Sequence, residues 1–332
     1  MKRLLCPNIL IPLIFGAALV AALLSFANVT KVIALITAFH PVGVLYFVLL
    51  MLAYETVRGV QWHVLLRALG VEASLRTQAF TFLGGEVTKS LPIGNYFQNY
   101  LLQQSEGTDF SRSSAATTLV IWVEDAVCLA GLLILGLGHW TWLRPVIALG
   151  LAAAALVGGA LYAGRNAVHA PRWMERRKSM RALIAGIKTF REGAADLLRP
   201  RLLILVTALG AVYLTIAGAA LYVVAHGLGL GTVTVTQALA VYFFSLAIGL
   251  LIPIPVDIGL TEVSGVGAFL AIDASKNAAV GVMLLNRVLS IVAALLIALV
   301  AAVFLRAEFR AVLRARPRRS STARATARAE QA

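Results

Sequence analysis

Two ionisable side chains, Glu86 and Lys89, lie in an otherwise apolar stretch that spans residues 77–104. Because residues three apart on a helix share a face, these two side chains can pair. One interpretation is a binding site for a polar headgroup, in which Lys89 points its charge at a phosphate and Glu86 orients it. The alternative is a self-neutralising pair that lets a broken helical segment lie near a membrane interface.

A pair of adjacent carboxylates, Glu124 and Asp125, lies inside a second apolar run. Two such groups in a membrane are costly unless they are paired or partly protonated. When the chain is aligned with itself at an offset of 162 positions, Glu124 and Asp125 fall on Asn286 and Arg287. Related positions of an inverted repeat can face each other, so we predict that Arg287 pairs with one of the two carboxylates. This pair is either a buried ion pair that holds two halves of the protein together or a direct binding site for a headgroup or a coupling ion.

A third stretch, residues 252–265, reads IPIPVDIGLTEVSG and carries the candidate binding residues Asp257 and Glu262. Its prolines break a helix, and Gly259 permits a turn. We predict a new helix that starts near Asp257 or Thr261, whose free N–H groups would favour an anion such as a phosphate. The simpler alternative is that one of these two residues only caps the helix.

Other side chains indicate little chemistry. Arg58 and His63 lie in residues 55–76, where the apolar side chains fall mostly on one helical face, so we predict an interfacial helix with both residues facing solvent or lipid. The sequence has no nucleophile elbow, HExxH or P-loop motif, its five histidines are scattered, and its two cysteines form no CxxC. We therefore expect no catalytic residue, no metal and no cofactor, and a protein that is not an enzyme.

The elements that position these residues follow from the composition. The chain of 332 residues is 60% hydrophobic and 13% charged, with a mean hydropathy of +0.87. Soluble proteins average about 25% charged residues, so this chain is a polytopic membrane protein. A net charge of +14 could indicate nucleic acid binding. However, the basic residues lie between the apolar runs, as the positive-inside rule requires, and we expect no nucleic acid partner.

We predict an all-α polytopic membrane protein with about six full spans. The spans are residues 9–27, 41–57, 115–137, 145–163, 202–225 and 278–305. Two further segments, residues 77–104 and 236–270, contain proline and glycine inside apolar sequence and are predicted as broken re-entrant hairpins. Loop charges place both termini in the cytoplasm of a bacterial inner membrane, and the Arg-rich tail beyond Pro317 is expected to be disordered.

The two broken segments enter from opposite sides, and each precedes a full span, which is the pattern of an inverted-topology repeat. We divide the chain into N-terminal spans with the interfacial helix (residues 1–76), a first repeat (77–163), a basic cytoplasmic loop (164–200), a second, inverted repeat (201–305) and a basic cytoplasmic tail (306–332). In this arrangement the tips of the two hairpins meet near the middle of the membrane.

Several short motifs resemble the lysylphosphatidylglycerol synthase transmembrane-region family, the flippase-like membrane half of the multiple peptide resistance factor. They are WHVLLRALG (62–70), GGEVTKSLPIG (84–94), YLLQQSEG (100–107), VEDAV (123–127), IPIPVDIGLTE (252–262) and LLNRVLS (284–290). The resemblance implies a membrane protein that moves or binds a lipid. No aminoacyl-transfer domain follows residue 305, so lipid aminoacylation by this chain is not expected.

Together these observations predict a transporter-like protein that holds the polar headgroup of a phospholipid, a polyprenyl-linked glycolipid or a hopanoid between two hairpins. Its partners would be the lipid substrate and the bilayer. The alternative is a non-transporting accessory subunit that presents lipid to a lipid- or glycan-synthesis enzyme, with the basic loop and tail as the docking surface.

Overall fold

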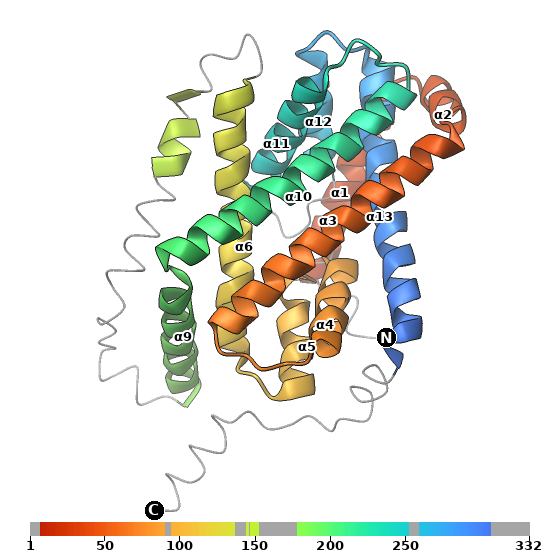
Figure 1. Ribbon diagram of the computed structural model, residues 1–332. Helices are drawn as coiled ribbons and strands as arrows, with labels where there is room; N and C mark the ends of the chain where they lie inside the picture. The colour runs from red at the N-terminus through yellow and green to blue at the C-terminus, as the bar shows by residue number, and fades with distance from the viewer. Residues whose placement is uncertain are drawn as a thin grey trace, which may run out of the picture.

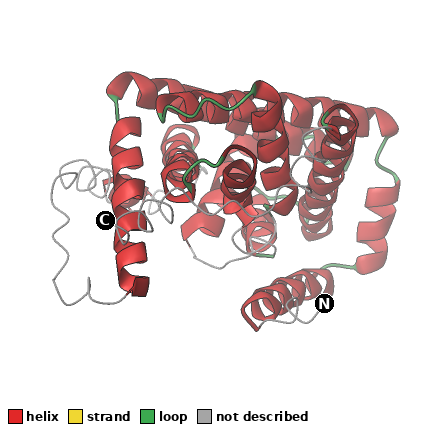
Figure 2. Ribbon diagram, turned by 90° about the horizontal axis from the view of Figure 1, so that it is seen from below, coloured by secondary structure: helices red, strands yellow, loops and turns green. Residues whose placement is uncertain are grey.

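The computed structural model describes residues 7–89, 94–136, 144–145, 147–152, 178–251 and 259–306. Within these ranges the secondary structure is helical and contains no strand (Figure 1, Figure 2). The predicted all-α class is therefore confirmed. The predicted disordered tail beyond Pro317 lies outside the described residues.

Four of the described helices are long and apolar enough to cross a membrane, which takes about 20 residues. They are α3 (Pro41–Ala68), α6 (Phe110–Leu135), α10 (Pro200–Gly227) and α13 (Lys276–Phe304). A fifth candidate is α1 (Pro7–Phe26) together with α2 (Val29–Thr37), which meet at a bend of 97°. The sixth predicted span, residues 145–163, lies mostly outside the described residues.

The prediction of a separate interfacial helix after residue 57 is wrong. Helix α3 continues without a break from Pro41 to Ala68, with Pro41 in its first turn and His40 as its N-cap. The apolar face that indicated an interfacial helix instead packs in the protein, where Trp62, Leu65 and Leu66 are buried. Because no proline falls between residues 42 and 68, nothing in the sequence forces the helix to end earlier.

Both broken segments form pairs of helices. In the first, α4 (Leu75–Thr88) is followed by a short 3-10 helix η1 (Gly94–Tyr96) and by α5 (Phe97–Glu106), and α4 packs against α5. In the second, α11 (Val235–Leu251) packs against α12 (Leu260–Leu270). The first pair lies toward the lower end of the molecule and the second toward the upper end (Figure 1). We refer to these pairs as the first and second hairpins.

The long helices hold the hairpins in place. Helices α3 and α10 run side by side diagonally across the front of the molecule and make the most extensive helix–helix contact described (Figure 1). The side-chain amide of the fully buried Gln61 in α3 donates a hydrogen bond of 2.8 Å to the carbonyl oxygen of Val206 in α10. A large apolar core includes Phe47, Tyr213 and Phe269, and a smaller one includes Phe82 and Leu102 of the first hairpin.

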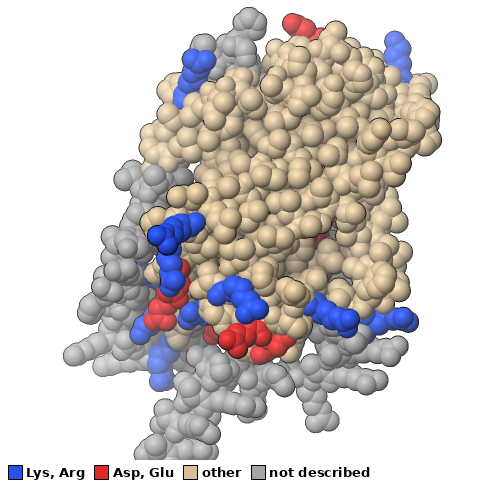
Figure 3. Space-filling model, in the orientation of Figure 1, with Lys and Arg blue, Asp and Glu red and all other residues tan. Residues whose placement is uncertain are grey.

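Helix α9 (Lys178–Leu197) packs along α6. An ion pair of 2.9 Å between Arg112 of α6 and Asp196 of α9 joins the two helices. Charged side chains gather mostly at the lower end of the face in Figure 3, whereas the middle of that face carries few charged side chains. This distribution agrees with a protein whose middle lies in lipid.

Candidate functional site

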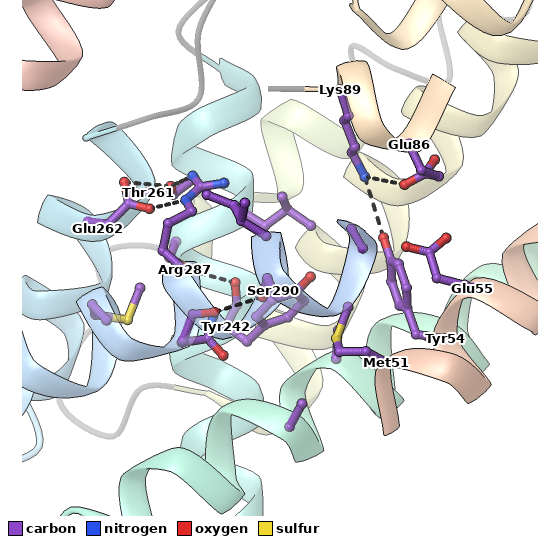
Figure 4. Close-up of a pocket in the computed structure, with 18 residues that line it drawn as sticks. Met51, Tyr54, Glu55, Glu86, Lys89, Tyr242, Thr261, Glu262, Arg287 and Ser290 are labelled. Carbon is purple, nitrogen blue, oxygen red and sulfur yellow. Dashed lines mark hydrogen bonds and ion pairs between the residues drawn. The ribbon is translucent and has the colours of Figure 1, made fainter. Parts of the chain in front are cut away.

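A cavity of about 190 Å³, with both charged and apolar side chains in its wall, lies between α4 of the first hairpin and α11 and α12 of the second (Figure 4). Its wall comes from α3, α4, α10, α11, α12 and α13. This volume is far above the roughly 15 Å³ that a single water needs. Its polar lining residues are Tyr54, Glu55, Glu86, Lys89, Tyr242, Ser245, Thr261, Glu262, Asn286, Arg287 and Ser290.

On one side of the cavity, Glu86 and Lys89 form the predicted pair. The Lys89 Nζ lies 3.9 Å from Glu86 Oε2 and donates a hydrogen bond of 3.4 Å to the Tyr54 hydroxyl oxygen. Lys89 caps the C-terminus of α4, where a positive charge is favoured by the helix dipole. The Thr88 hydroxyl oxygen lies 3.0 Å from the carbonyl oxygens of Gly84 and Gly85 and 3.3 Å from that of Gly94, so its one proton can be donated to any of the three. Thr88 thus links the end of α4 to the start of the 3-10 helix.

Behind this pair lies Arg58, which the sequence had indicated as a surface residue. That prediction is wrong, because Arg58 is only 7% exposed. Its Nη1 lies 2.5 Å from Glu86 Oε1, and its Nη2 lies 3.3 Å from Glu124 Oε1. Glu124 also accepts a hydrogen bond of 3.0 Å from the Tyr213 hydroxyl group. A buried arginine is tolerated here because two carboxylates compensate its charge.

The other residue predicted at the surface, His63, is partly buried. Its Nδ1 lies 2.7 Å from the side-chain oxygen of Gln78, and Gln78 in turn donates to the carbonyl oxygen of Ala73. This network joins α3 to the start of α4. His63 therefore has a structural role in the first hairpin.

On the opposite side of the cavity, Arg287 of α13 is bound to α12. Its Nε donates to Glu262 Oε1 at 2.5 Å, and its Nη2 donates to the Thr261 hydroxyl oxygen at 2.8 Å. The predicted ion pair of Arg287 with Glu124 or Asp125 is therefore wrong. Because α12 and α13 are consecutive and packed together, Glu262 reaches Arg287 from within the same half of the chain.

Glu262 has a second role at the start of α12. Its Oε2 accepts hydrogen bonds from the backbone N–H of Gly259, at 2.6 Å, and from the hydroxyl group of Thr261, at 3.1 Å. Gly259 is the N-cap and has a φ of 95°, a conformation that glycine adopts without strain. The predicted helix start was close, but neither Thr261 nor Asp257 is the cap. Asp257 itself lies outside the described residues.

The structure brings together most of the predicted site residues. Five of them line the cavity: Glu86, Lys89, Glu262, Asn286 and Arg287. Glu124 lies behind the wall and reaches the site through Arg58. Asp125 is half-buried and does not line the cavity, and its Oδ1 has no hydrogen-bond partner among the described residues.

The cavity is also lined by Tyr54, Glu55 and Tyr242, which the sequence alone did not indicate as site residues. Glu55 follows an apolar run directly, and this position led to its interpretation as the start of an interfacial segment. Two tyrosines inside apolar runs gave no charge signal. If residues 41–68 are interpreted as one continuous helix, Glu55 and Arg58 lie three residues apart on one face of that helix, inside the membrane.

In Figure 4, the Lys89 cluster and the Arg287 cluster lie on opposite sides of the cavity. Each cluster combines a cation with a carboxylate and a hydroxyl group: Lys89 with Glu86 and Tyr54, and Arg287 with Glu262 and Thr261. Such groups can hydrogen-bond phosphate, hydroxyl and amine groups of a ligand. Inside apolar helices, ionisable groups around a cavity are the usual mark of a binding site or a pathway.

Apolar spans and two broken hairpins around a charged cavity define an all-α polytopic membrane protein with an internal polar site. The chain belongs to the family of the lysylphosphatidylglycerol synthase TM region, whose model matches residues 9–298. The family resemblance seen in the short motifs is therefore confirmed. A comparison with curated proteins finds no match.

Proposed function

We propose that this protein moves a lipid with a polar headgroup across a bacterial inner membrane. The headgroup would enter the cavity between the hairpins while the apolar tail remains in the bilayer. The single observation that carries this proposal is the cavity of about 190 Å³ that lies among apolar helices and is lined by charged side chains from both halves of the chain. The lipid is a phospholipid, a polyprenyl-linked glycolipid or a hopanoid.

The charges of the cavity wall support this function over a purely structural one. Arg58, which is buried behind the wall, already compensates Glu86 and Glu124. Lys89 and Arg287 face the cavity itself, with side chains 29% and 27% exposed. Both cations therefore present atoms to the cavity that a headgroup can reach. Lys89 and Arg287 are therefore the groups that we assign to the headgroup, with Asn286 beside them.

We further propose that the lower end of the molecule in Figure 1 faces the cytoplasm, together with both termini. The lysine- and arginine-rich region around residues 164–200 and the tail after residue 305 support this orientation. No catalytic motif was found in the sequence, and we propose that the protein binds and moves its lipid without changing it chemically.

The test is movement of lipid in vesicles that contain the purified full-length protein. Fluorescently labelled phosphatidylglycerol, phosphatidylethanolamine and a polyprenyl-phosphate sugar serve as probes, and a membrane-impermeant quencher reports the fraction in the outer leaflet. The proposal predicts that at least one probe becomes fully accessible to the quencher in protein-containing vesicles, while about half stays protected in protein-free vesicles. Equal protection of every probe in both kinds of vesicle would contradict it.

A second function, an accessory subunit of a lipid- or glycan-synthesis complex, is favoured by the charged groups at the lower end (Figure 3). Deletion of residues 307–332 separates the two functions, because this Arg-rich tail would be part of a docking surface. The transport function predicts unchanged lipid movement by the truncated protein. The accessory function predicts a cellular defect despite normal membrane insertion, and no lipid movement by the isolated full-length protein.

A further inference from the structure

Glu55 is a carboxyl group in the cavity wall to which the proposed headgroup site assigns no role. It lies on α3, lines the cavity and is 7% exposed. Its Oε2 is buried and has no hydrogen-bond partner among the described residues. A buried carboxylate oxygen without a partner loses its hydration and gains nothing in return, so such an atom in a native protein requires an explanation.

The cations near Glu55 are engaged with other carboxylates. Arg58, one turn along α3, binds Glu86 and Glu124, and Lys89 pairs with Glu86. Across the cavity, Arg287 binds Glu262. Of the cavity-lining carboxyl groups, Glu86 and Glu262 therefore each have a described ion pair, and Glu55 has none.

The titratable and charged groups around Glu55 come from every helix of the cavity wall and from the helices packed against α3. They are Tyr54 and Arg58 of α3, Glu86 and Lys89 of α4, Glu124 of α6, Tyr213 of α10, Tyr242 of α11, Glu262 of α12 and Arg287 of α13. Helix α9 also touches α3, and its Asp196 pairs with Arg112 instead. The three carboxyl groups and the three cations of this environment balance each other, so an ionised Glu55 adds one uncompensated negative charge and a proton at Glu55 restores neutrality.

We propose that Glu55 binds and releases a proton during each transport cycle and thereby couples lipid movement to a proton gradient. This inference rests on the proposed transport function. Glu55 would take a proton from water while the cavity communicates with one side of the membrane and release it to the other side. The carboxyl group alternates between its ionised and neutral forms, and no other bond changes. Intramembrane carboxyl groups serve as proton relays in other pumps and transporters.

The burial of Glu55 favours a proton over the headgroup as its ligand. A headgroup amine would need open access to the carboxylate, whereas a proton needs only a water molecule beside it. At 7% exposure, Glu55 is far less open to the cavity than Lys89 or Arg287, whose side chains are 29% and 27% exposed. Glu86 and Glu262 are similarly recessed, but each of them is held by a cation. Among the described residues of the wall, Glu55 is therefore the recessed carboxyl group that has no ion pair.

The experiment measures the leaflet distribution of labelled phosphatidylglycerol and phosphatidylethanolamine in vesicles with an imposed pH gradient. Potassium and valinomycin clamp the membrane potential. If one proton accompanies one lipid, a gradient of about one pH unit shifts the ratio between the leaflets by up to about tenfold, because one pH unit corresponds to a tenfold change in an equilibrium. Reversal of the gradient should reverse the shift.

Three variants identify the carboxyl group. Glu55→Gln removes the proton site with little change in shape, and we expect it to move lipid but to leave the leaflets equal under any gradient. Glu55→Asp keeps a carboxyl group and should keep a shift of several fold. Glu106→Gln alters an exposed glutamate of α5 and should behave like the wild type. Size-exclusion chromatography confirms that each variant is folded.

The outcomes separate the coupling from the transport function. Wild-type protein that moves the lipids but ignores the pH gradient overturns the coupling alone. Folded Glu55→Gln protein that still builds a gradient-dependent shift also overturns it. Folded Glu55→Gln protein that moves no lipid at any pH would mean that Glu55 holds the headgroup. Wild-type protein that moves no lipid overturns both the coupling and the transport function.

Discussion

Arg58 and Glu86, which are 28 residues apart in the sequence, join helix α3 to the end of helix α4 through two hydrogen bonds of 2.5 and 2.6 Å from one guanidinium nitrogen. The same arginine reaches Glu124 of α6. Three helices of the first half therefore share one buried cation. This junction fixes the end of α4, which carries Lys89 into the cavity.

Replacement of Arg58 should consequently destabilise the protein strongly. Arg58→Met leaves the buried Glu124 without its cation and leaves Glu86 with only the longer contact of 3.9 Å to Lys89. The loss of one partner from a buried pair costs about 3–5 kcal/mol. The free energy of unfolding is measured by titration with sodium dodecyl sulfate in mixed micelles. Arg67→Met, an exposed arginine two turns further along α3, is the matched control and should change little. A similar small change for both variants would show that Arg58 is not a structural junction.

Gly94 should tolerate no side chain. A Cβ atom at this position would lie 1.7 Å from the carbonyl oxygen of Thr88, a backbone atom that cannot move without a shift of the hairpin. Gly94→Ala is therefore expected to open the break between α4 and η1 and to lower both stability and lipid movement. The measurements are thermal unfolding in detergent and the vesicle assay.

Gly267 of α12 provides the control for Gly94. Nothing lies within 4 Å of a Cβ atom built there, and the residue is exposed inside a helix. Alanine is favoured over glycine in helices by about 1 kcal/mol, so Gly267→Ala should leave the melting temperature unchanged or raise it. Greater destabilisation by Gly267→Ala than by Gly94→Ala would contradict the packing described for the first hairpin.

Glu262 has two roles that two substitutions can separate. Glu262→Gln keeps an oxygen that can accept from the N–H of Gly259 but loses the charge that faces Arg287. Glu262→Ala loses both, and an N-terminal cap is worth about 1 kcal/mol. We expect the alanine variant to be less stable than the glutamine variant by about that amount. Equal free energies of unfolding for the two variants would argue against the capping role.

The membrane class, the two broken hairpins and the contact between Glu86 and Lys89 could all be predicted from the sequence. These features depend on composition, on proline and glycine inside apolar runs, and on a spacing of three residues within one helix. The buried site of Arg58 could not be predicted, because its partners lie on α4 and α6. Only the packing of three helices brings them together.

The partner of Arg287 shows the limit of an argument from repeats. Alignment of the two predicted repeats at an offset of 162 positions indicated Glu124 and Asp125 as partners of Arg287. Such an alignment does not determine which carboxylate lies close to Arg287 in space. Glu262, 25 residues before Arg287, is carried to it by the packing of α12 on α13. Glu55 was missed because it ends the most apolar part of α3, and local hydropathy cannot distinguish a helix that ends there from one that continues.

The most direct test of the headgroup cavity is a reversible block. Ser290 lines the cavity from α13, and Ser290→Cys introduces a thiol there, in a background where Cys6 is replaced by serine. The remaining Cys128 is fully buried. A bulky methanethiosulfonate reagent is attached to the purified protein, which is placed in vesicles with the labelled lipids. Thr232→Cys, at an exposed position away from the cavity, is the control.

We expect lipid movement by the Ser290→Cys protein to stop after labelling and to return when a reductant removes the label. The Thr232→Cys protein should move lipid equally well before and after labelling. Fully labelled Ser290→Cys protein that moves lipid at the unlabelled rate would contradict the central claim that the headgroup passes through the cavity between the hairpins.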